Sequence, residues 1–227
     1  MTNLQLLWQE SFNEAIGREQ ESSGTNPVDW RSGGRATKEW PEKENGDWWN
    51  ANGIKMLEDF TEVWAASGWS VWITPEGVPA LELGLNVYYG DTLVKAFIDM
   101  IAVTAEGELV VVDFKTGKSM PSNMQLGLYA SSIEKQFGIR PAHGYYYDAR
   151  KAQMILTYDL ARWTPQLFTE LFRQFELGVE NNIFLPNVGM ACPTCSVGAY
   201  CYANGGEMAS LMDPLYAIAH KKEETNE

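Results

Sequence analysis

Two aspartates and a lysine lie on neighbouring segments that are typical of the two strands of one hairpin. Asp99 belongs to the segment 92–103, and Asp113 and Lys115 belong to the next β-rich segment. If the intervening loop is centred on Glu106, Asp99 faces Asp113 with Cβ atoms about 5 Å apart. Because strand side chains alternate, Lys115 projects on the same side as Asp113. The hairpin therefore gathers two carboxylates and one ammonium.

Two aspartates this close repel each other, and their burial is costly unless a cation neutralises them. Carboxylate oxygens suit Mg²⁺ or Mn²⁺, and the backbone carbonyl of Phe114 could supply a further oxygen. Such a metal activates a bound water and shields a phosphate, while Lys115 orients the water or stabilises developing negative charge. The alternative is an ion pair of Lys115 with Asp99 or Asp113 that needs no metal. Spacing alone leaves both interpretations open.

The residues around this hairpin resemble the core of RecB-type nucleases in the PD-(D/E)XK superfamily. The resemblance rests on Ile98-Asp99-Met100, on the strand ending Asp113-Phe114-Lys115-Thr116-Gly117, and on the Gln-x-x-x-Tyr spacing of Gln125 and Tyr129. It implies a restriction-endonuclease-like core in which Asp99 and Asp113 bind a metal and Lys115 is catalytic. It also implies that Gln125 and Tyr129 contact DNA. The segment containing residues 35–38 and Trp48-Trp49 resembles that of short stand-alone members of the family from phages of actinobacteria.

Two further acids are candidate metal ligands by the same resemblance. Glu82 matches an acidic position often seen in this branch, and its alternative role is that of a solvated strand residue. Many relatives also place a histidine or glutamate on the helix before the sheet. That helix has no histidine here, so Glu58 is chosen from its acids.

Nucleic-acid contact has its own candidates and alternatives. A DNA end or single strand could stack on aromatic side chains and be held by Lys118, Arg35 and Lys38, although each of these cations could equally be solvated. The sequence Ser122-Asn123-Met124-Gln125 is also a capping box, which would satisfy Gln125 without DNA.

Cys192, Cys195 and Cys201 are the only cysteines and follow a Cys-x2-Cys-x5-Cys spacing. They resemble the C-terminal part of the iron–sulfur motif of RecB-like and CRISPR-adaptation nucleases, whose fourth cysteine lies upstream. Because this chain has no upstream cysteine, a [4Fe–4S] cluster or a zinc ion would need His220, an acid or solvent as fourth ligand. The alternative is three small buried thiols that bind nothing.

Composition restricts the possible partners. The chain has 227 residues, 45% of them hydrophobic, and its 30 acidic and 17 basic residues give a net charge of -13. This charge argues against bulk attraction to nucleic acid or anionic membrane, so DNA would have to be bound at a local site. No membrane span or signal peptide is visible. We expect a cytoplasmic protein, in the host cell if it is phage-encoded, whose partners are DNA ends or single strands and recombination or replication proteins.

The pattern of apolar and turn residues predicts a single α/β (α+β) domain over residues 1–227, with a central mixed β-sheet flanked by helices. A helical region and arm (1–68) precede a catalytic core (69–160) and a C-terminal helix with the cysteine segment (161–227). Asp47 is the expected N-cap of the second helix, and Thr164 that of the last. The strands 92–103 and 108–115 carry apolar side chains on both faces, Phe97 included, which predicts helices on both sides. The expected helices span 4–16, 48–66 and 123–137, and the other strands span 70–74, 80–89, 144–147 and 154–158.

These features predict a divalent-metal-dependent DNA nuclease, with exonuclease action preferred, that hydrolyses phosphodiester bonds. The rival interpretations are a non-catalytic DNA-end or protein-binding module that keeps the fold, and a redox-sensing cluster protein. A nucleotide-binding loop at Thr116-Gly117-Lys118-Ser119 is excluded because Val112 stands where its first glycine belongs. With only two histidines, the chain also offers no serine–histidine–acid arrangement.

Overall fold

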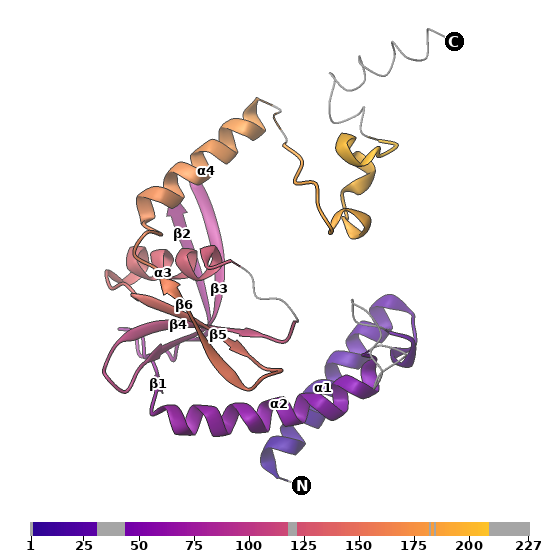
Figure 1. The fold of residues 1–227 in the computed structure, drawn as a ribbon, viewed down its shortest axis with the longest axis vertical. Helices are drawn as coiled ribbons and strands as arrows, with labels where there is room; N and C mark the ends of the chain where they lie inside the picture. The colour runs from indigo at the N-terminus through magenta and orange to yellow at the C-terminus, as the bar shows by residue number, and fades with distance from the viewer. Residues whose placement is uncertain (1, 31–43, 118–121, 182, 184, 209–227) are drawn as a thin grey trace. The chain divides into compact units, whose positions relative to one another are not determined.

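The computed structural model describes residues 2–30, 44–117, 122–181, 183 and 185–208, and Figure 1 traces the chain. The chain forms two compact units. One consists of Met1–Tyr89 with Leu93–Phe168, and the other of Gly90–Thr92 with Thr169–Glu227. The single nuclease domain over residues 1–227 stays a prediction.

The first unit is built on a curled mixed sheet. Its strands follow the order β1-β3-β4-β5-β6, and β2 pairs with β3. β4 and β5 run parallel, whereas β3 runs antiparallel to β4 and β6 runs antiparallel to β5. The strands are β1 (Ser70–Val71), β2 (Leu81–Tyr89), β3 (Thr92–Val103), β4 (Leu109–Lys115), β5 (His143–Asp148) and β6 (Gln153–Asp159). The predicted mixed sheet flanked by helices is confirmed.

The β3–β4 hairpin has the register that the sequence predicts. Its pairs run from Val103 with Leu109 to Met100 with Val112, as a loop centred on Glu106 requires. The loop closes through a 2.8 Å hydrogen bond from the Thr104 N–H to the Glu108 carbonyl. Gly107 takes the left-handed conformation with φ +85°, which glycine adopts at little cost.

Helix α3 (Met124–Phe137) makes the crossover between the parallel strands β4 and β5. Its buried side chains include Leu126, Ala130 and Ile133. Gly127 lets the helix approach the indole of Trp163, because a Cβ atom at this position would lie 2.2 Å from the ring. α3 therefore lies close against the sheet, with its first turn at the end of β4.

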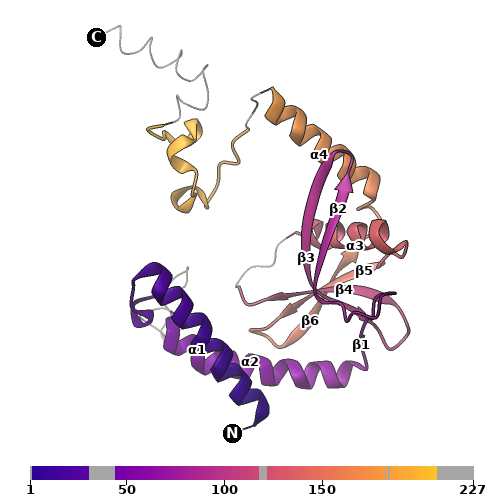
Figure 2. The same ribbon diagram turned by 180° about the vertical axis from the view of Figure 1, so that it is seen from behind.

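Helix α2 (Gly46–Ser67) covers the opposite face of the sheet, as Figures 1 and 2 show from both sides. Its apolar side chains pack on a cluster that includes Met100, Val112 and Tyr147. The N-cap is Asn45, whose side chain accepts from the Trp48 N–H at 3.0 Å, so the prediction of Asp47 was wrong by two residues. The earlier residue begins an additional half turn that apolar periodicity does not reveal.

Helix α1 (Asn3–Ser23) packs on α2 and has no buried residue. The indole N–H of Trp8 donates to the Asn50 carbonyl at 3.1 Å. Close approach is possible because Gly53 has no side chain where the Trp8 ring lies. The last helix, α4 (Pro165–Glu180), begins after Thr164, whose hydroxyl accepts from the Leu167 N–H at 3.2 Å as predicted.

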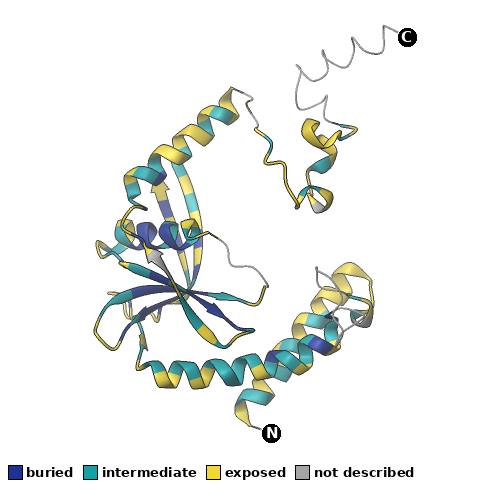
Figure 3. Cartoon of the chain, viewed as in Figure 1, coloured by how far each residue is buried: buried dark blue, intermediate teal, exposed yellow. Residues whose placement is uncertain are grey.

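Buried residues gather in the sheet and in α3 (Figure 3). The outer half of β3 is different, because Leu93, Lys95 and Phe97 are exposed while Ala96 and Ile98 are buried. Phe97 is 67% exposed, so the prediction that it is covered was wrong. β3 leaves β4 beyond Met100 and pairs there with β2 alone, and only one face of that hairpin is packed. None of the helices in the described ranges is long and apolar enough to cross a membrane.

Candidate active site

The candidate site lies where β3 and β4 separate. Their last paired residues are Met100 and Val112. One residue further, the Asp99 carboxylate accepts from the Phe114 N–H at 2.8 Å, through Oδ2. A side chain thus replaces a backbone partner at the point of separation. Asp99 remains partly exposed, so its other oxygen lone pairs can reach a ligand.

Asp113 is the most buried acid of the site, with an exposed fraction of 1%. Its Oδ2 lies 2.5 Å from Nζ of Lys115. This contact is an ion pair with poor hydrogen-bond directionality, because among the described residues Oδ2 has no donor in good geometry. Burial raises the pKa of Asp113 and the negative charge of Asp99 adds to the effect, whereas Lys115 opposes it.

Lys115 is connected to the first turn of α3. Its Nζ donates to Oε1 of Gln125 at 3.3 Å, and Nε2 of Gln125 donates to the Tyr129 hydroxyl at 2.9 Å. The capping-box alternative for Gln125 is contradicted, because Asn123 is the N-cap and no side chain caps the helix. The Gln-x-x-x-Tyr pair thus forms a relay to the lysine on one helix face.

Tyr146 on β5 closes the site from the neighbouring strand. Nζ of Lys115 lies 5.5 Å from the centre of its ring, a cation–π distance. Its hydroxyl donates to the Ser122 carbonyl at 2.9 Å, which ties the start of α3 to the sheet. Burial, with the charge of Asp113 and the presence of Tyr129, raises the pKa of Tyr146 to about 12, so this hydroxyl stays protonated.

Asp99 and Asp113 are suited to bind a hard divalent cation. Oδ2 of Asp113 is buried, and among the described residues it has the Lys115 ammonium beside it but no well-directed donor, so a divalent cation would add to its compensation. The Phe114 N–H is used by Asp99, and its carbonyl remains a predicted ligand. Across the described ranges, no three His, Cys, Asp or Glu side chains are arranged to hold a metal ion. Waters and substrate oxygens would have to complete the coordination shell, as is usual for Mg²⁺.

Glu82 and Glu58, the two further acids that the resemblance suggests as metal ligands, lie in different places. The Ile101 N–H donates to the Ala80 carbonyl at 3.0 Å, and this register puts Glu82 opposite Asp99. Glu82 is exposed and has a left-handed φ of +48°, a conformation that costs about 1 kcal/mol for a non-glycine residue. Glu58 accepts from Gln5 of α1 at 3.1 Å, on the helix that covers the opposite sheet face. The structure thus brings neither into one acidic cluster with Asp113.

Other predicted residues lie away from this site or outside the description. Arg35, Lys38, Lys118 and His220 fall outside the described residues. The cysteines lie in the second unit along three short 3-10 turns, η2 (Cys192–Thr194), η3 (Gly198–Tyr200) and η4 (Tyr202–Asn204). Cys192 begins η2, Cys195 follows it, and Cys201 stands between η3 and η4. A further turn, η1 (Pro27–Asp29), lies near the start of the chain. All three are free thiols, and Sγ of Cys192 accepts from the Gly189 N–H at 3.2 Å.

Sequence reasoning did not select Tyr146, Arg150 or Glu44. Arg150 donates to the Thr116 carbonyl at the end of β4, through Nε at 2.5 Å. Its carboxylate partner Glu44 lies 106 residues away in the sequence, so no local pattern could have paired them. Tyr146 stands in the run Tyr145-Tyr146-Tyr147, where strand alternation singles out one tyrosine only once the neighbouring strand is known.

Comparison with known proteins adds an independent observation. The sequence profile of the PD-(D/E)XK nuclease superfamily matches residues 8–202. The chain is 31% identical over 190 residues to the Gene 69 protein of Mycobacterium phage D29, covering 74% of this chain and 69% of that protein. It is also 31% identical over 175 residues to the Gene 69 protein of Mycobacterium phage L5, covering 66% of this chain and 60% of that protein. The matched range contains every residue of the site described above.

Proposed function

Because the chain belongs to the PD-(D/E)XK nuclease superfamily, we propose that it is a divalent-metal-dependent DNA nuclease of the RecB-like branch, acting as an exonuclease. The observation that carries this proposal is the pairing of Asp99 and Asp113 at the separation of β3 and β4, with Lys115 beside them. The superfamily generally consists of metal-dependent phosphodiesterases. The proposal assigns that chemistry to these three side chains.

Each residue of the site would have a distinct role. Asp99 and Asp113 would hold Mg²⁺ or Mn²⁺, with the Phe114 carbonyl and Glu82 as further proposed oxygens. Glu58 is left out of the proposed shell, because it lies on the helix that covers the opposite face of the sheet. A bound metal would lower the pKa of a coordinated water and shield the phosphate charge. Lys115 would orient the attacking water or stabilise the negative charge that develops on the phosphate.

We place the nucleic acid beside the same lysine. Gln125 and Tyr129 line the first turns of α3 and already contact Lys115 through the relay, so a phosphate or base there would lie next to the metal. Lys118, Arg35 and Lys38 are the proposed cations for the backbone of a DNA end or single strand. Because the two relatives are phage proteins, the proposed location is the cytoplasm of a host cell. Recombination or replication proteins are the proposed partners.

The cysteine segment has a separate proposed role. A [4Fe–4S] cluster or a zinc ion bound by Cys192, Cys195 and Cys201 would stabilise the second unit and take no part in hydrolysis. Metal analysis and the absorbance near 400 nm of anaerobically purified protein would distinguish a cluster from zinc and from free thiols.

A non-catalytic DNA-binding module is the second candidate function. The observation that favours it is the ion pair of Lys115 with Asp113, since a lysine can neutralise a buried carboxylate without metal. In that case the chain would bind DNA ends without cutting them.

One experiment distinguishes the two functions. End-labelled single- and double-stranded linear DNA is incubated with the purified protein in Mn²⁺ or in EDTA, and divalent metal binding is measured by calorimetry. We expect cleavage in Mn²⁺ only, and none by Asp113→Ala. The exposed Asp91→Asn serves as the control acid. Intact DNA with wild-type protein in Mn²⁺, or unimpaired cleavage by Asp113→Ala, would refute the nuclease. DNA binding without metal binding would support the module.

A further inference from the structure

The guanidinium of Arg150, in the turn between β5 and β6, is enclosed by groups from three parts of the first unit. Its two terminal nitrogens donate to the two carboxylate oxygens of Glu44 at 3.0 and 2.8 Å. Its centre lies 5.1 Å from the ring of Trp48 and 5.2 Å from that of Trp49. Glu44 thus occupies the edge of the guanidinium, and the two indole rings, whose centres are 4.9 Å apart, lie together on one side of it.

The third nitrogen of the guanidinium is directed at the end of β4, the strand that carries Lys115. Nε of Arg150 donates to the Thr116 carbonyl at 2.5 Å, and the Ala149 N–H donates to the Lys115 carbonyl at 3.0 Å. Two consecutive carbonyls at the end of β4 are therefore held by one turn. One of them belongs to Lys115, whose ammonium lies against Asp113.

The ion pair of Glu44 with Arg150 is strong because it is largely buried and bidentate. Glu44 is 8% exposed and the Arg150 side chain 19% exposed, so the ion pair is poorly screened by solvent. A bidentate arginine–carboxylate pair fixes both position and orientation. Removing one partner would leave a buried charge without compensation. Arg150 therefore connects the start of α2 to the end of β4 through one rigid group.

We propose that Arg150 is a positioning residue for Lys115, and that Glu44 with Trp48 and Trp49 holds Arg150 in place. This inference rests on the proposed nuclease function. Arg150 would act on Lys115 through the backbone, because each of its three guanidinium nitrogens donates to a group inside the protein. Its role would be to fix the backbone from which Lys115 reaches the metal-bound water, a placement on which rate depends steeply.

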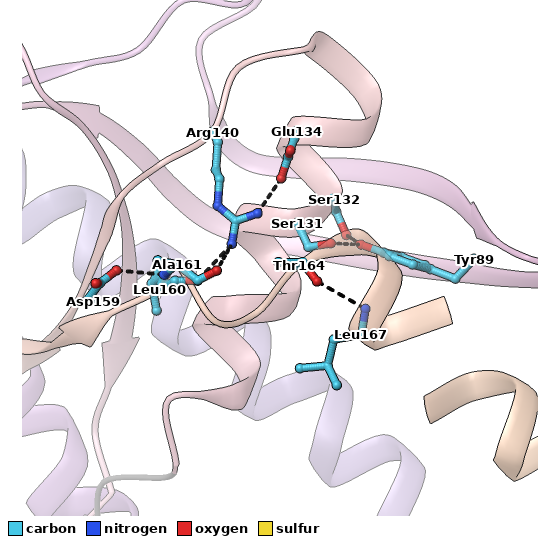
Figure 4. Close-up of polar contacts among 10 residues, drawn as sticks. All are labelled: Tyr89, Ser131, Ser132, Glu134, Arg140, Asp159, Leu160, Ala161, Thr164 and Leu167. Atoms are coloured by element: carbon cyan, nitrogen blue, oxygen red, sulfur yellow. Dashed lines mark hydrogen bonds and ion pairs between the residues drawn. The ribbon is translucent and has the colours of Figure 1, made fainter. Parts of the chain in front are cut away.

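Arg140 offers a matched control, shown in Figure 4. It forms an ion pair with Glu134 and donates to the carbonyls of Leu160 and Ala161 at 2.8 and 3.2 Å. Its side chain is 23% exposed, close to the value for Arg150. It lies beyond the C-terminal end of α3, roughly 20 Å along that helix from Gln125. The two arginines thus share an anchoring chemistry and differ in what they anchor.

The test measures single-turnover cleavage and KM for linear DNA with full-length wild-type protein, Arg150→Met, Arg150→Lys and Arg140→Met in saturating Mn²⁺. All are assayed well below their melting temperatures. For Arg150→Met we expect the rate to fall about 10- to 100-fold, as for other groups that orient a first contact shell, with KM within about twofold. Arg150→Lys should fall between wild type and Arg150→Met. Arg140→Met should lose stability and keep its rate within about twofold.

Glu44→Gln is the second variant and serves if Arg150→Met does not fold. It keeps one acceptor for the guanidinium, so we expect a fall of about three- to tenfold. The inference is overturned if Arg150→Met or Glu44→Gln keeps the wild-type rate, or if Arg140→Met falls equally. If the wild-type protein cuts no DNA, the proposed function fails first, which is a distinguishable result.

Discussion

At the scale of single residues, the site is defined by one buried carboxylate that its own protein does not fully satisfy. Among the described residues, Oδ2 of Asp113 has no well-directed donor, and the carboxylate faces the negative charge of Asp99. Nζ of Lys115 lies 2.5 Å from Oδ2 of Asp113 and also donates to Gln125. A divalent cation would compensate both acids and free the lysine for the substrate.

Removing this carboxylate should abolish stabilisation by metal. A ligand that binds only the native state at 100 times its Kd adds about 2.7 kcal/mol to the free energy of unfolding. We expect that increase for wild-type protein in Mn²⁺ and its loss in Asp113→Asn, measured by urea denaturation with and without the metal. Asp91→Asn should respond like wild type. An equal metal response from Asp113→Asn would place the metal elsewhere.

The relay from α3 gives a second prediction at this scale. Gln125→Ala removes the only bridge between Lys115 and Tyr129 that the described contacts contain, so the lysine loses its lateral restraint. We expect the cleavage rate to fall about tenfold, within the range for removing one hydrogen-bonded orienting group. Tyr129→Phe should have a smaller effect, because Gln125 keeps its contact with Lys115.

The control for the relay is Gln9→Ala. Gln9 also makes a side-chain amide hydrogen bond, to Asn13 on exposed α1, and its removal should leave the rate unchanged. If Gln125→Ala matches Gln9→Ala, the relay has no part in cleavage.

At the scale of elements, local sequence determines the site well and distant contacts complete it. The bounds of β3 and the pairing of Met100 with Val112 were predictable, because one hairpin loop and its glycine fix the register. The contact of Lys115 with Gln125 joins residues 10 positions apart. The sequence motif predicted that Gln125 belongs to the site but not that it contacts the lysine. The pair of Glu44 with Arg150 depends on tertiary packing, which no periodicity encodes.

The sequence errors have the same physical origin. Apolar residues on both faces of the strand predicted that Phe97 is covered. The prediction was wrong because an apolar pattern does not show where β3 separates from β4. The sequence Ser122-Asn123-Met124-Gln125 fits a capping box, but the helix begins at Met124 after Asn123. The side-chain amide of Gln125 contacts Lys115 instead. In both cases the choice between two locally allowed arrangements is made by a neighbour in space.

Close packing of α3 leads to a prediction at this scale. Gly127→Ala would place a methyl group 2.2 Å from the Trp163 ring, so helix and indole must separate. We expect a loss of about 1 to 3 kcal/mol in the free energy of unfolding, as for overpacked cores, together with slower cleavage because α3 carries Gln125. Chemical denaturation measures the first and the DNA assay the second.

Gly17→Ala in α1 is the matched helical control. No heavy atom lies within 4 Å of a Cβ placed there. Alanine should therefore raise the free energy of unfolding by about 0.5 to 1 kcal/mol through helix propensity alone. Similar changes from the two substitutions would contradict the proposed packing of α3.

At the scale of the whole molecule, the acidic surplus determines how DNA can be held. A net charge of -13 repels the phosphate backbone at long range, so attraction has to come from a few cations and from the metal at the site. The proposed cations are Arg35, Lys38 and Lys118. Such a surface favours short contact with a strand end over wrapping of a duplex.

This limit is measurable as a salt dependence. Each neutralised phosphate of a single strand contributes about -0.7 to the slope of log K against log salt concentration, so three cations predict a slope of about -2. We expect this value for Asp113→Asn protein and labelled single-stranded DNA, followed by fluorescence anisotropy over a KCl series in EDTA. Lys118→Gln should lower the magnitude by about 0.7. Lys55→Gln should not change the slope, because the exposed Lys55 is paired with Asp59 on α2. A slope beyond about -6 would indicate an extensive cationic surface, and a slope near zero would remove phosphate contact from the proposal.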